Sequence, residues 1–157
     1  MSKTDTLPLR DATEQDGPAL QSLYSAFYAE EGIVLDPDRQ WQNLLAMIRA
    51  PGSKMLVAVA PDGSLIGLVT ATITWGVEFG ACAEVEDLFV LPAHRGKGLA
   101  KHLMRTVIDF CQDQGAEMVS VVVTPDGLEQ NLKKFYTTLD FVESDRTVFY
   151  KSLKRTG

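Results

Sequence analysis

The chain has 157 residues, the size of one ordinary domain, so a single domain over residues 1–157 is expected. Apolar residues make up 45% of it and charged residues 23%, which is a globular composition and excludes a disordered chain. The formal net charge of −6 argues against a nucleic-acid-binding surface, and the absence of a run of about 18 apolar residues argues against a membrane span.

The first third of the chain predicts a short strand and two helices. Thr13 and Asp16 have the spacing of a capping box, which starts a helix, and Asp36-Pro37 is a typical start for another. Apolar residues recur every three or four positions in both segments. The expected ranges are 8–10 for the strand, from 15–17 to 30–32 for the first helix, and from 37 to about 50 for the second.

The middle of the chain predicts a hairpin, a third strand and a long helix. Residues 55–60 and 65–75 read as two strands around a β-turn at 61–64. A third strand is expected at 83–90, after a loop. The helix from residue 98 to about 114 carries a wide apolar stripe and is expected to pack against a sheet.

The last third predicts another strand, a helix and a final strand pair. The expected ranges are 118–123 for the strand, 124–127 for a turn, 128–139 for the helix, and 141 onwards and 147–152 for the strand pair. A helical crossover would make strand 118–123 parallel to strand 83–90. The order βααβββαβαββ predicts an α/β (mixed α+β) fold, with helices on both faces of a mixed sheet.

A glycine-bearing basic turn joins strand 83–90 to the long helix. Gly96 and Gly98 allow a sharp turn and a close approach to a ligand, while Arg95, Lys97 and Lys101 add positive charge. The N-terminus of a helix presents free N–H groups that suit a phosphate. A tight connection with solvated basic residues is the alternative, but strand, turn and helix together favour a phosphate-binding site.

Two carboxylates stand two residues apart on strand 83–90. Glu84 and Glu86 therefore share a face, about 7 Å apart by the strand rise. Repulsion and partial burial would raise the pKa of either one towards the working range of a general base, which could deprotonate an attacking amine. A solvated strand face is the alternative. Asp87 is expected to point to the other face and to have a structural role.

Three segments together resemble the GNAT superfamily, the GCN5-related N-acetyltransferases. Residues 95–100 fit its R-x-x-G-x-[GA] signature, residues 135–141 look like its F-Y-x-x-x-G-F motif, and residues 9–13 resemble its opening strand and turn. The resemblance covers nearly the whole chain. It implies a mostly antiparallel GNAT-like sheet, acetyl-CoA as donor, and direct transfer of the acetyl group to a primary amine of a small molecule or a peptide.

The resemblance also assigns roles to individual residues. Glu86 becomes the expected base, whereas Glu84 is expected to be solvated. The Tyr136 phenol would protonate the departing thiolate of coenzyme A, with aromatic packing as its alternative role. Asp140 replaces the glycine that the family has at this position, and aspartate tolerates the left-handed backbone needed there.

Coenzyme and acceptor contacts follow from the same resemblance. Backbone N–H groups of the turn would bind the pyrophosphate, and Val90 would hydrogen-bond the pantetheine arm. The expected coenzyme-binding residues are Val90, Arg95, Gly96, Lys97, Gly98, Leu99, Ala100 and Lys101. The acceptor pocket is expected at Tyr24, Phe27, Tyr28 and Glu31. An equally good interpretation is that the aromatic residues pack in the core and that the acidic end of the helix is solvated.

Other features of the sequence limit the setting. Cys82 and Cys111 form no metal-ligand spacing with His94 and His102, so no metal is expected. We expect no signal peptide and a cytoplasmic location. The expected partner is an amine substrate, and binding to nucleic acid or to a membrane is not expected. The sequence allows a homodimer but does not decide the oligomeric state. A non-catalytic acyl-CoA-binding domain is the alternative function, although Glu86 and Tyr136 favour an enzyme.

Overall fold

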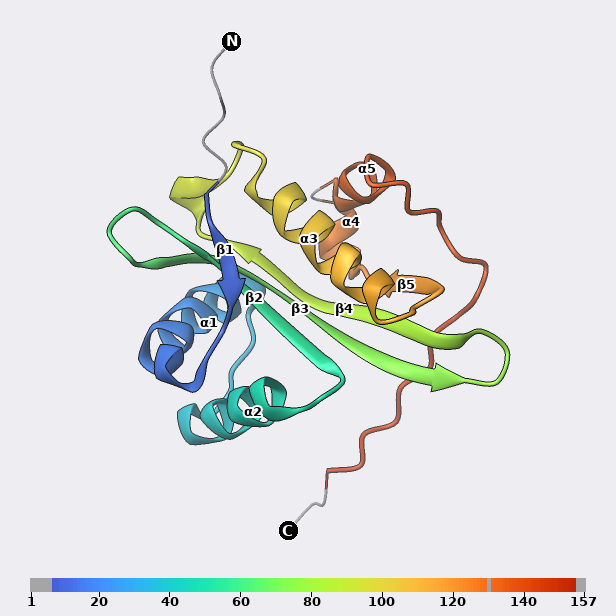
Figure 1. The fold of residues 1–157 in the computed structure, drawn as a ribbon, viewed down its shortest axis with the longest axis horizontal. Helices are drawn as coiled ribbons and strands as arrows, with labels where there is room; N and C mark the ends of the chain where they lie inside the picture. The colour runs from blue at the N-terminus through green and yellow to red at the C-terminus, as the bar shows by residue number, and fades with distance from the viewer. Residues whose placement is uncertain (1–6, 130, 155–157) are drawn as a thin grey trace. The chain divides into compact units, whose positions relative to one another are not determined.

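The computed structural model describes residues 7–129 and 131–154 (Figure 1). The chain divides into two compact units, residues 1–122 and 123–157, and each is described by itself. The prediction of a single domain over residues 1–157 stays a prediction. The first unit holds the sheet, its covering helices and the glycine turn.

The sheet has five strands in the order β1-β2-β3-β4-β5. Neighbours pair antiparallel from β1 to β4, whereas β5 pairs parallel to β4. This confirms a mixed, mostly antiparallel sheet and the predicted parallel crossover. The bounds are Leu9–Asp11 for β1, Ser53–Val59 for β2, Leu65–Gly76 for β3, Gly80–Val90 for β4 and Met118–Val121 for β5.

Helices cover both faces of this sheet, as predicted. Helices α1 (Gly17–Glu31) and α2 (Pro37–Arg49) lie on one face and α3 (Leu99–Asp113) on the other (Figure 1). We call these the α1 face and the α3 face. The core of the α1 face comprises Leu20, Leu23, Tyr24, Leu44, Met55, Val57, Leu65, Leu68 and Phe89. The buried stripe of α3 comprises Leu99, Leu103, Met104, Val107 and Cys111.

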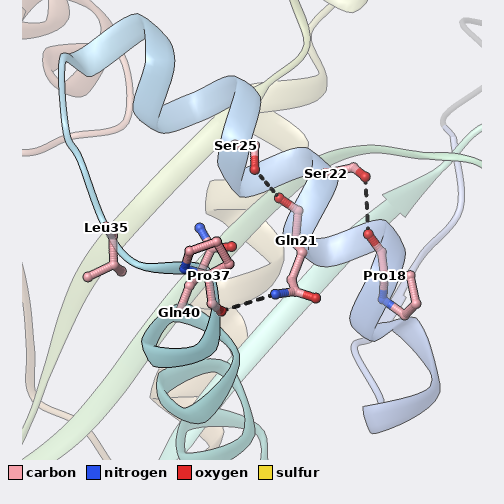
Figure 2. A pocket seen from close by; sticks show the side chains of 7 residues that line it. All are labelled: Pro18, Gln21, Ser22, Ser25, Leu35, Pro37 and Gln40. Carbon is pink, nitrogen blue, oxygen red and sulfur yellow. Dashed lines mark hydrogen bonds between the residues drawn. The ribbon is translucent and has the colours of Figure 1, made fainter.

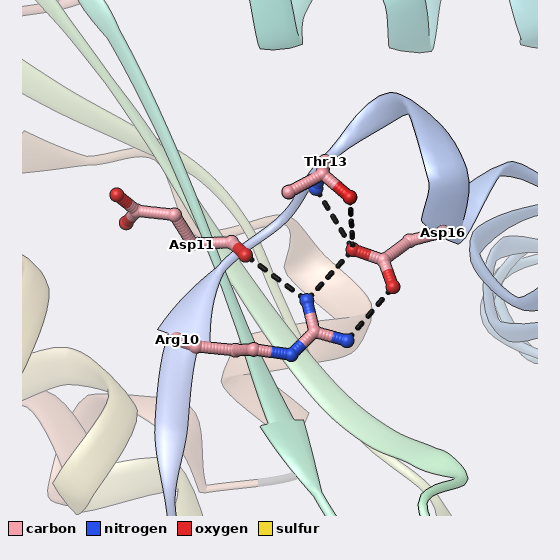
Figure 3. Close-up of polar contacts among 4 residues, drawn as sticks. All are labelled: Arg10, Asp11, Thr13 and Asp16. Atoms are coloured by element: carbon pink, nitrogen blue, oxygen red, sulfur yellow. Dashed lines mark hydrogen bonds and ion pairs between the residues drawn. The ribbon is translucent and has the colours of Figure 1, made fainter.

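The start of α1 is fixed by the predicted capping residues and by one further side chain. Thr13 donates its backbone N–H to the Asp16 carboxylate at 2.8 Å, before the short 3-10 helix η1 (Glu14–Asp16). Arg10 of β1 binds both oxygens of that carboxylate at 2.8 Å (Figure 3). Its guanidinium lowers the pKa of Asp16 to about 2. The first strand is thereby tied to the first helix.

Helix ends in the first unit follow local chemistry. Gly32 ends α1 in the left-handed region, at φ 68°, where glycine is unstrained. Asp36 caps α2 by accepting the N–H of Arg39, and Pro37 occupies the first turn. These sequence signals explain why the predicted ends of both helices agree with the structure to within a residue or two.

The second unit departs from the prediction. The expected turn at 124–127 forms part of a helix, α4 (Pro125–Glu129), and the expected helix 128–139 is reduced to α5 (Leu132–Thr137). Within residues 131–154 no strand forms, so the strand pair expected from 141 onwards and at 147–152 is wrong for this structure. Its apolar alternation is suited to a strand, but a strand also requires a hydrogen-bonded partner.

Candidate active site

The glycine turn, residues 95–101, follows β4 through the 3-10 helix η2 (Pro92–His94) and opens α3. Gly96 and Gly98 have φ of 76° and 82°, and a Cβ at either would meet nothing within 4 Å. The glycines are therefore needed for backbone direction and not for space. The sharp turn predicted at Gly96 and Gly98 is confirmed, and its role in binding a phosphate stays a prediction.

The first amides of α3 point out of the start of the helix and have no partner within it. The first hydrogen bond at the start of α3 is donated by His102 to the Gly98 carbonyl, at 3.0 Å. The N–H groups of Leu99, Ala100 and Lys101 precede that bond, so they have no partner within the helix. Lys97 is exposed and Lys101 is half-buried, which leaves positive charge beside these amides. An anion would be stabilised here by N–H groups, helix dipole and side-chain charge together.

Arg95 has a second role in the structure. Its Nε donates to the Val90 carbonyl at 2.8 Å, and its guanidinium pairs with Glu30 of α1 at 2.8 Å. It also lies 5.4 Å from the centroid of the Phe89 ring. Arg95 thus ties the glycine turn to the end of β4 and to the last turn of α1, with further N–H donors left over. The predicted coenzyme contacts of Arg95 and Val90 stay predictions.

The pairing of β4 with β3 changes register at a bulge. Thr70 of β3 stands opposite both Glu86 and Asp87, whereas the residues on either side pair one to one. A bulge shifts the alternation of side chains by one position. Both Glu86 and Asp87 therefore lie on the α1 face, with Glu84 before them and Phe89 after them. The prediction that Asp87 points away from Glu86 is wrong, because it assumed a regular strand.

Asp87 is held by two hydroxyl groups at this bulge. Tyr24 of α1 donates to Asp87 Oδ2 at 2.9 Å, and Thr70 donates to the same oxygen at 3.3 Å. The Asp87 N–H in turn donates to Thr70 Oγ1 at 3.1 Å. Burial raises the pKa of Asp87, and the two hydroxyl donors partly offset the rise. We call Tyr24, Thr70 and Asp87 the Asp87 network.

Glu86 is the exposed carboxylate beside this network. Its pKa is raised, first by partial burial, then by the charge of Asp87 and finally by that of Glu84. The direction is the one that a general base for an amine needs. Sequence reasoning expected Glu84 to be the repelling partner and missed the larger contribution of Asp87. Beyond the Val85–Val121 pair the ladder between β4 and β5 ends, so the sheet opens next to Glu86.

The predicted acceptor residues on α1 occupy different environments. Tyr24 is buried and bonded to Asp87, and Phe27 stacks on Phe89 with ring centroids 4.9 Å apart. Tyr28 is half-buried, and its ring lies 5.5 Å from that of Tyr24. Burial raises the pKa of its phenol, and the charges of Asp87 and Glu86 add to the rise. Glu31 is exposed at the helix end. Their role in acceptor binding stays a prediction.

Tyr136 lies on α5 in the second unit. Its ring makes edge contacts with Phe135 and Phe141, at centroid distances of 5.1 and 5.5 Å, and burial raises the pKa of its phenol. Asp140 has φ of 65°, so the left-handed conformation expected in place of the family's glycine is confirmed. The role of Tyr136 as a general acid stays a prediction.

A hollow of about 610 Å³ lies elsewhere, between α1 and α2. Figure 2 shows its polar lining, including Gln21, which donates to the Pro37 carbonyl at 3.2 Å, and Ser25, which donates to the Gln21 carbonyl at 2.8 Å. Its lining includes neither Tyr24 nor Tyr28 of α1 and neither Glu86 nor Asp87 of β4. We do not include it in the candidate site.

Within residues 7–129 and 131–154, no group of three or more His, Cys, Asp or Glu side chains could hold a metal ion. Among the same residues no helix is long and apolar enough to cross a membrane. The cytoplasmic location, the homodimer and the lack of a nucleic-acid or membrane partner stay predictions.

Comparisons with known proteins bear on the same region. A family model described as "Acetyltransferase (GNAT) family" matches residues 18–141. Streptothricin acetyltransferase of Streptomyces lavendulae is 37% identical over 73 residues, which are 46% of this chain and 36% of that protein. Aminoglycoside N(6')-acetyltransferase type 1 of Salmonella typhimurium is 28% identical over 109 residues, 67% of this chain and 73% of that protein. This chain thus spans about a third of the first relative.

A solved structure has a similar fold. Aminoglycoside N-acetyltransferase AAC(6')-Iy, crystallised in complex with CoA, matches with a TM-score of 0.79 and 21% identity. The match covers 94% of this chain and 95% of the other. At this identity the likeness concerns the fold alone.

Proposed function

Since this chain belongs to the Acetyltransferase (GNAT) family, we propose that it transfers an acetyl group from acetyl-CoA to a primary amine of a small cationic molecule by direct attack. Two relatives support the proposal, because the name of one states acetyl transfer and the name of the other states transfer to a nitrogen of an aminoglycoside. No cysteine or serine nucleophile arrangement is apparent in the sequence, so attack by the amine itself is the simpler route.

The observation that carries the proposal is the open row of amides in the glycine turn, directly after the strand that bears Glu86. The N–H groups of residues 96–101, with Lys97 and Lys101, fit the pyrophosphate of a coenzyme. The fold is shared with a protein crystallised with CoA, which supports the same ligand here. When bound, acetyl-CoA would supply the acetyl group as a thioester.

Glu86 would act on the acceptor amine. At neutral pH a primary amine is protonated and cannot attack, so a carboxylate must take its proton directly or through a water. The raised pKa of Glu86 increases its basicity, and its exposure leaves it accessible to an incoming amine. Tyr136 would give a proton to the departing sulfur. Val90 would supply backbone hydrogen bonds that align the pantetheine arm.

The charge of the site favours a cationic acceptor. Glu84, Glu86 and Asp87 gather on the α1 face of β4, and the chain as a whole carries a net charge of −6. Tyr28 adds an aromatic ring beside that of Tyr24, whose hydroxyl bonds Asp87, and an aromatic ring suits an ammonium group. Molecules with several amines, such as aminoglycosides and polyamines, fit this charge best, and a peptide amine is the second acceptor class.

A thiol-release assay tests the proposal. The purified protein is incubated with acetyl-CoA and one acceptor at a time from a panel of aminoglycosides, polyamines, amino acids and lysine peptides. We expect thiol release with an acceptor carrying several amines, and mass spectrometry should show one added acetyl group on a nitrogen. Coenzyme binding without turnover on any acceptor would favour the non-catalytic acyl-CoA-binding domain instead.

A further inference from the structure

Asp87 carries no role in the proposed reaction, yet its carboxylate is held by hydroxyl groups from two different elements of the first unit. Tyr24 of α1 and Thr70 of β3 both bond to its Oδ2, at 2.9 and 3.3 Å. Both anchoring residues are buried, with 4% of Tyr24 and none of Thr70 exposed. Burying an ionisable side chain costs free energy, so the presence of Asp87 at this position calls for a physical explanation.

The backbone at Asp87 suggests what the anchoring achieves. The Asp87 N–H, displaced from the β3 ladder by the bulge, donates instead to Thr70 Oγ1. Thr70 therefore bonds both the backbone and the side chain of the extra residue. A hydroxyl at this position satisfies the amide that the bulge would otherwise leave without a partner. The hydrogen bonds of the Asp87 network therefore stabilise the bulge.

The bulge in turn decides where Glu86 lies. In a regular strand, Glu86 and Phe89 would lie on opposite faces, because their numbers differ by three. Phe89 packs on Phe27 in the core of the α1 face, so without the bulge Glu86 would be directed to the α3 face. If β4 paired with β3 without the bulge, the Glu86 side chain would therefore lie on the face away from α1.

We propose that Asp87, held by Tyr24 and Thr70, is a positioning residue that fixes the bulge of β4 and so keeps Glu86 on the α1 face. The inference rests on the proposed function, because it assumes that Glu86 acts on the acceptor. The charge of Asp87 has a second effect, since it raises the pKa of Glu86. Among the residues that the structure describes, the titratable groups that interact with the charge of Glu86 are Glu84 and Asp87 on β4 and Tyr24 and Tyr28 on α1.

Thr70→Val tests the anchoring, with Thr70→Ser as its matched control. Valine keeps the shape but offers no acceptor to the Asp87 N–H, whereas serine keeps the hydroxyl. We expect kcat to fall about ten- to a hundredfold in Thr70→Val, as for other small misplacements of a reacting group, with the KM for acetyl-CoA unchanged. Thr70→Ser should restore most of the rate. A folded Thr70→Val with wild-type kcat, or a Thr70→Ser as slow as the valine variant, would overturn the proposal.

Measurements that need no turnover separate this inference from the proposed function. Hydrogen exchange of the Asp87 amide should be slow in the wild type and in Thr70→Ser, and fast in Thr70→Val or, if that variant fails to fold, in Thr70→Ala, because both variants lack the Oγ1 that accepts this amide. Carboxyl NMR should show a lower pKa for Glu86 in Asp87→Asn, because a like charge has been removed. Unchanged exchange and an unchanged Glu86 pKa would contradict the positioning role. Absence of thiol release by the wild type on every acceptor would contradict only the proposed function.

Discussion

The glycine turn and the bulge of β4 are neighbours in the chain, but they use different parts of the polypeptide. The turn works through backbone N–H groups, which two glycines at φ of 76° and 82° make available at the start of α3. The bulge works through side chains, whose direction depends on how β4 pairs with β3. Changes at the turn should therefore act on coenzyme binding, and changes at the bulge on acceptor chemistry.

The largest expected effect is the loss of coenzyme binding in Gly98→Asp. A coenzyme at 100 times its dissociation constant adds about 2.7 kcal/mol to the stability of the wild type, which thermal shift can measure. A carboxylate at the turn would repel the pyrophosphate, so the shift should vanish. Gly63→Asp is the matched control, because Gly63 has φ of 86°, a Cβ there would meet nothing within 4 Å, and it lies in the β2–β3 turn.

The control removes the main ambiguity of this test. Both substitutions place a charged residue in the left-handed region, at a cost of about 1 kcal/mol each. Only Gly98→Asp should lose the shift. An equal shift in Gly98→Asp and the wild type would contradict the phosphate site.

Tyr136→Phe is the next largest expected effect, on kcat alone. If the phenol protonates the departing thiolate, kcat should fall roughly 10²- to 10⁴-fold, nearer the low end because a thiolate leaves readily. Coenzyme affinity should barely change, because the interaction is made in the transition state. Tyr150→Phe removes a phenol from the same unit and should leave kcat unchanged. Near-normal turnover in Tyr136→Phe, with a lower melting temperature only in Tyr136→Ala, would indicate a packing role.

The agreement between sequence and structure differs between the two regions for a physical reason. Gly96 and Gly98 are required by local backbone geometry, so their role can be inferred from a short segment. The bulge depends on the partner strand, since it exists only where Thr70 faces both Glu86 and Asp87. The alternation rule therefore placed Asp87 on the wrong face. The same limitation explains the strands wrongly expected beyond residue 140, where alternation was read without a known partner.

A smaller effect is expected where Arg95 connects the glycine turn to α1. Both partners of the Arg95–Glu30 pair are partly exposed, so the pair contributes less than about 1 kcal/mol. Arg95→Gln and Glu30→Gln should each weaken coenzyme binding a few-fold, and the double variant no further than Arg95→Gln alone. Isothermal titration with CoA gives the three affinities. Tighter binding in Glu30→Gln would instead mean that Arg95, once released, binds phosphate directly.

The smallest kinetic effect is expected at Asp16, which belongs to neither region. Its pKa is about 2 in the folded chain, below the usual 3.8, so its contribution to stability is present above pH 3.8 and is lost as the pH falls towards 2. Asp16→Asn should lower the melting temperature at pH 7, with a difference that shrinks at acid pH, and should leave KM and kcat unchanged. A changed KM would show that the capping region reaches the site.

The pH dependence of Glu86→Gln tests the central claim most directly. If Glu86 removes the proton of the acceptor amine, the variant should lose the most activity at low pH, where the amine is protonated. The loss should shrink as the pH approaches the pKa of the amine, since the acceptor then arrives deprotonated. The measurement is kcat/KM for the acceptor against pH, with Glu84→Gln as the matched control on the same strand. A uniform loss at every pH, or an unchanged profile, would contradict the account of Glu86 as the base.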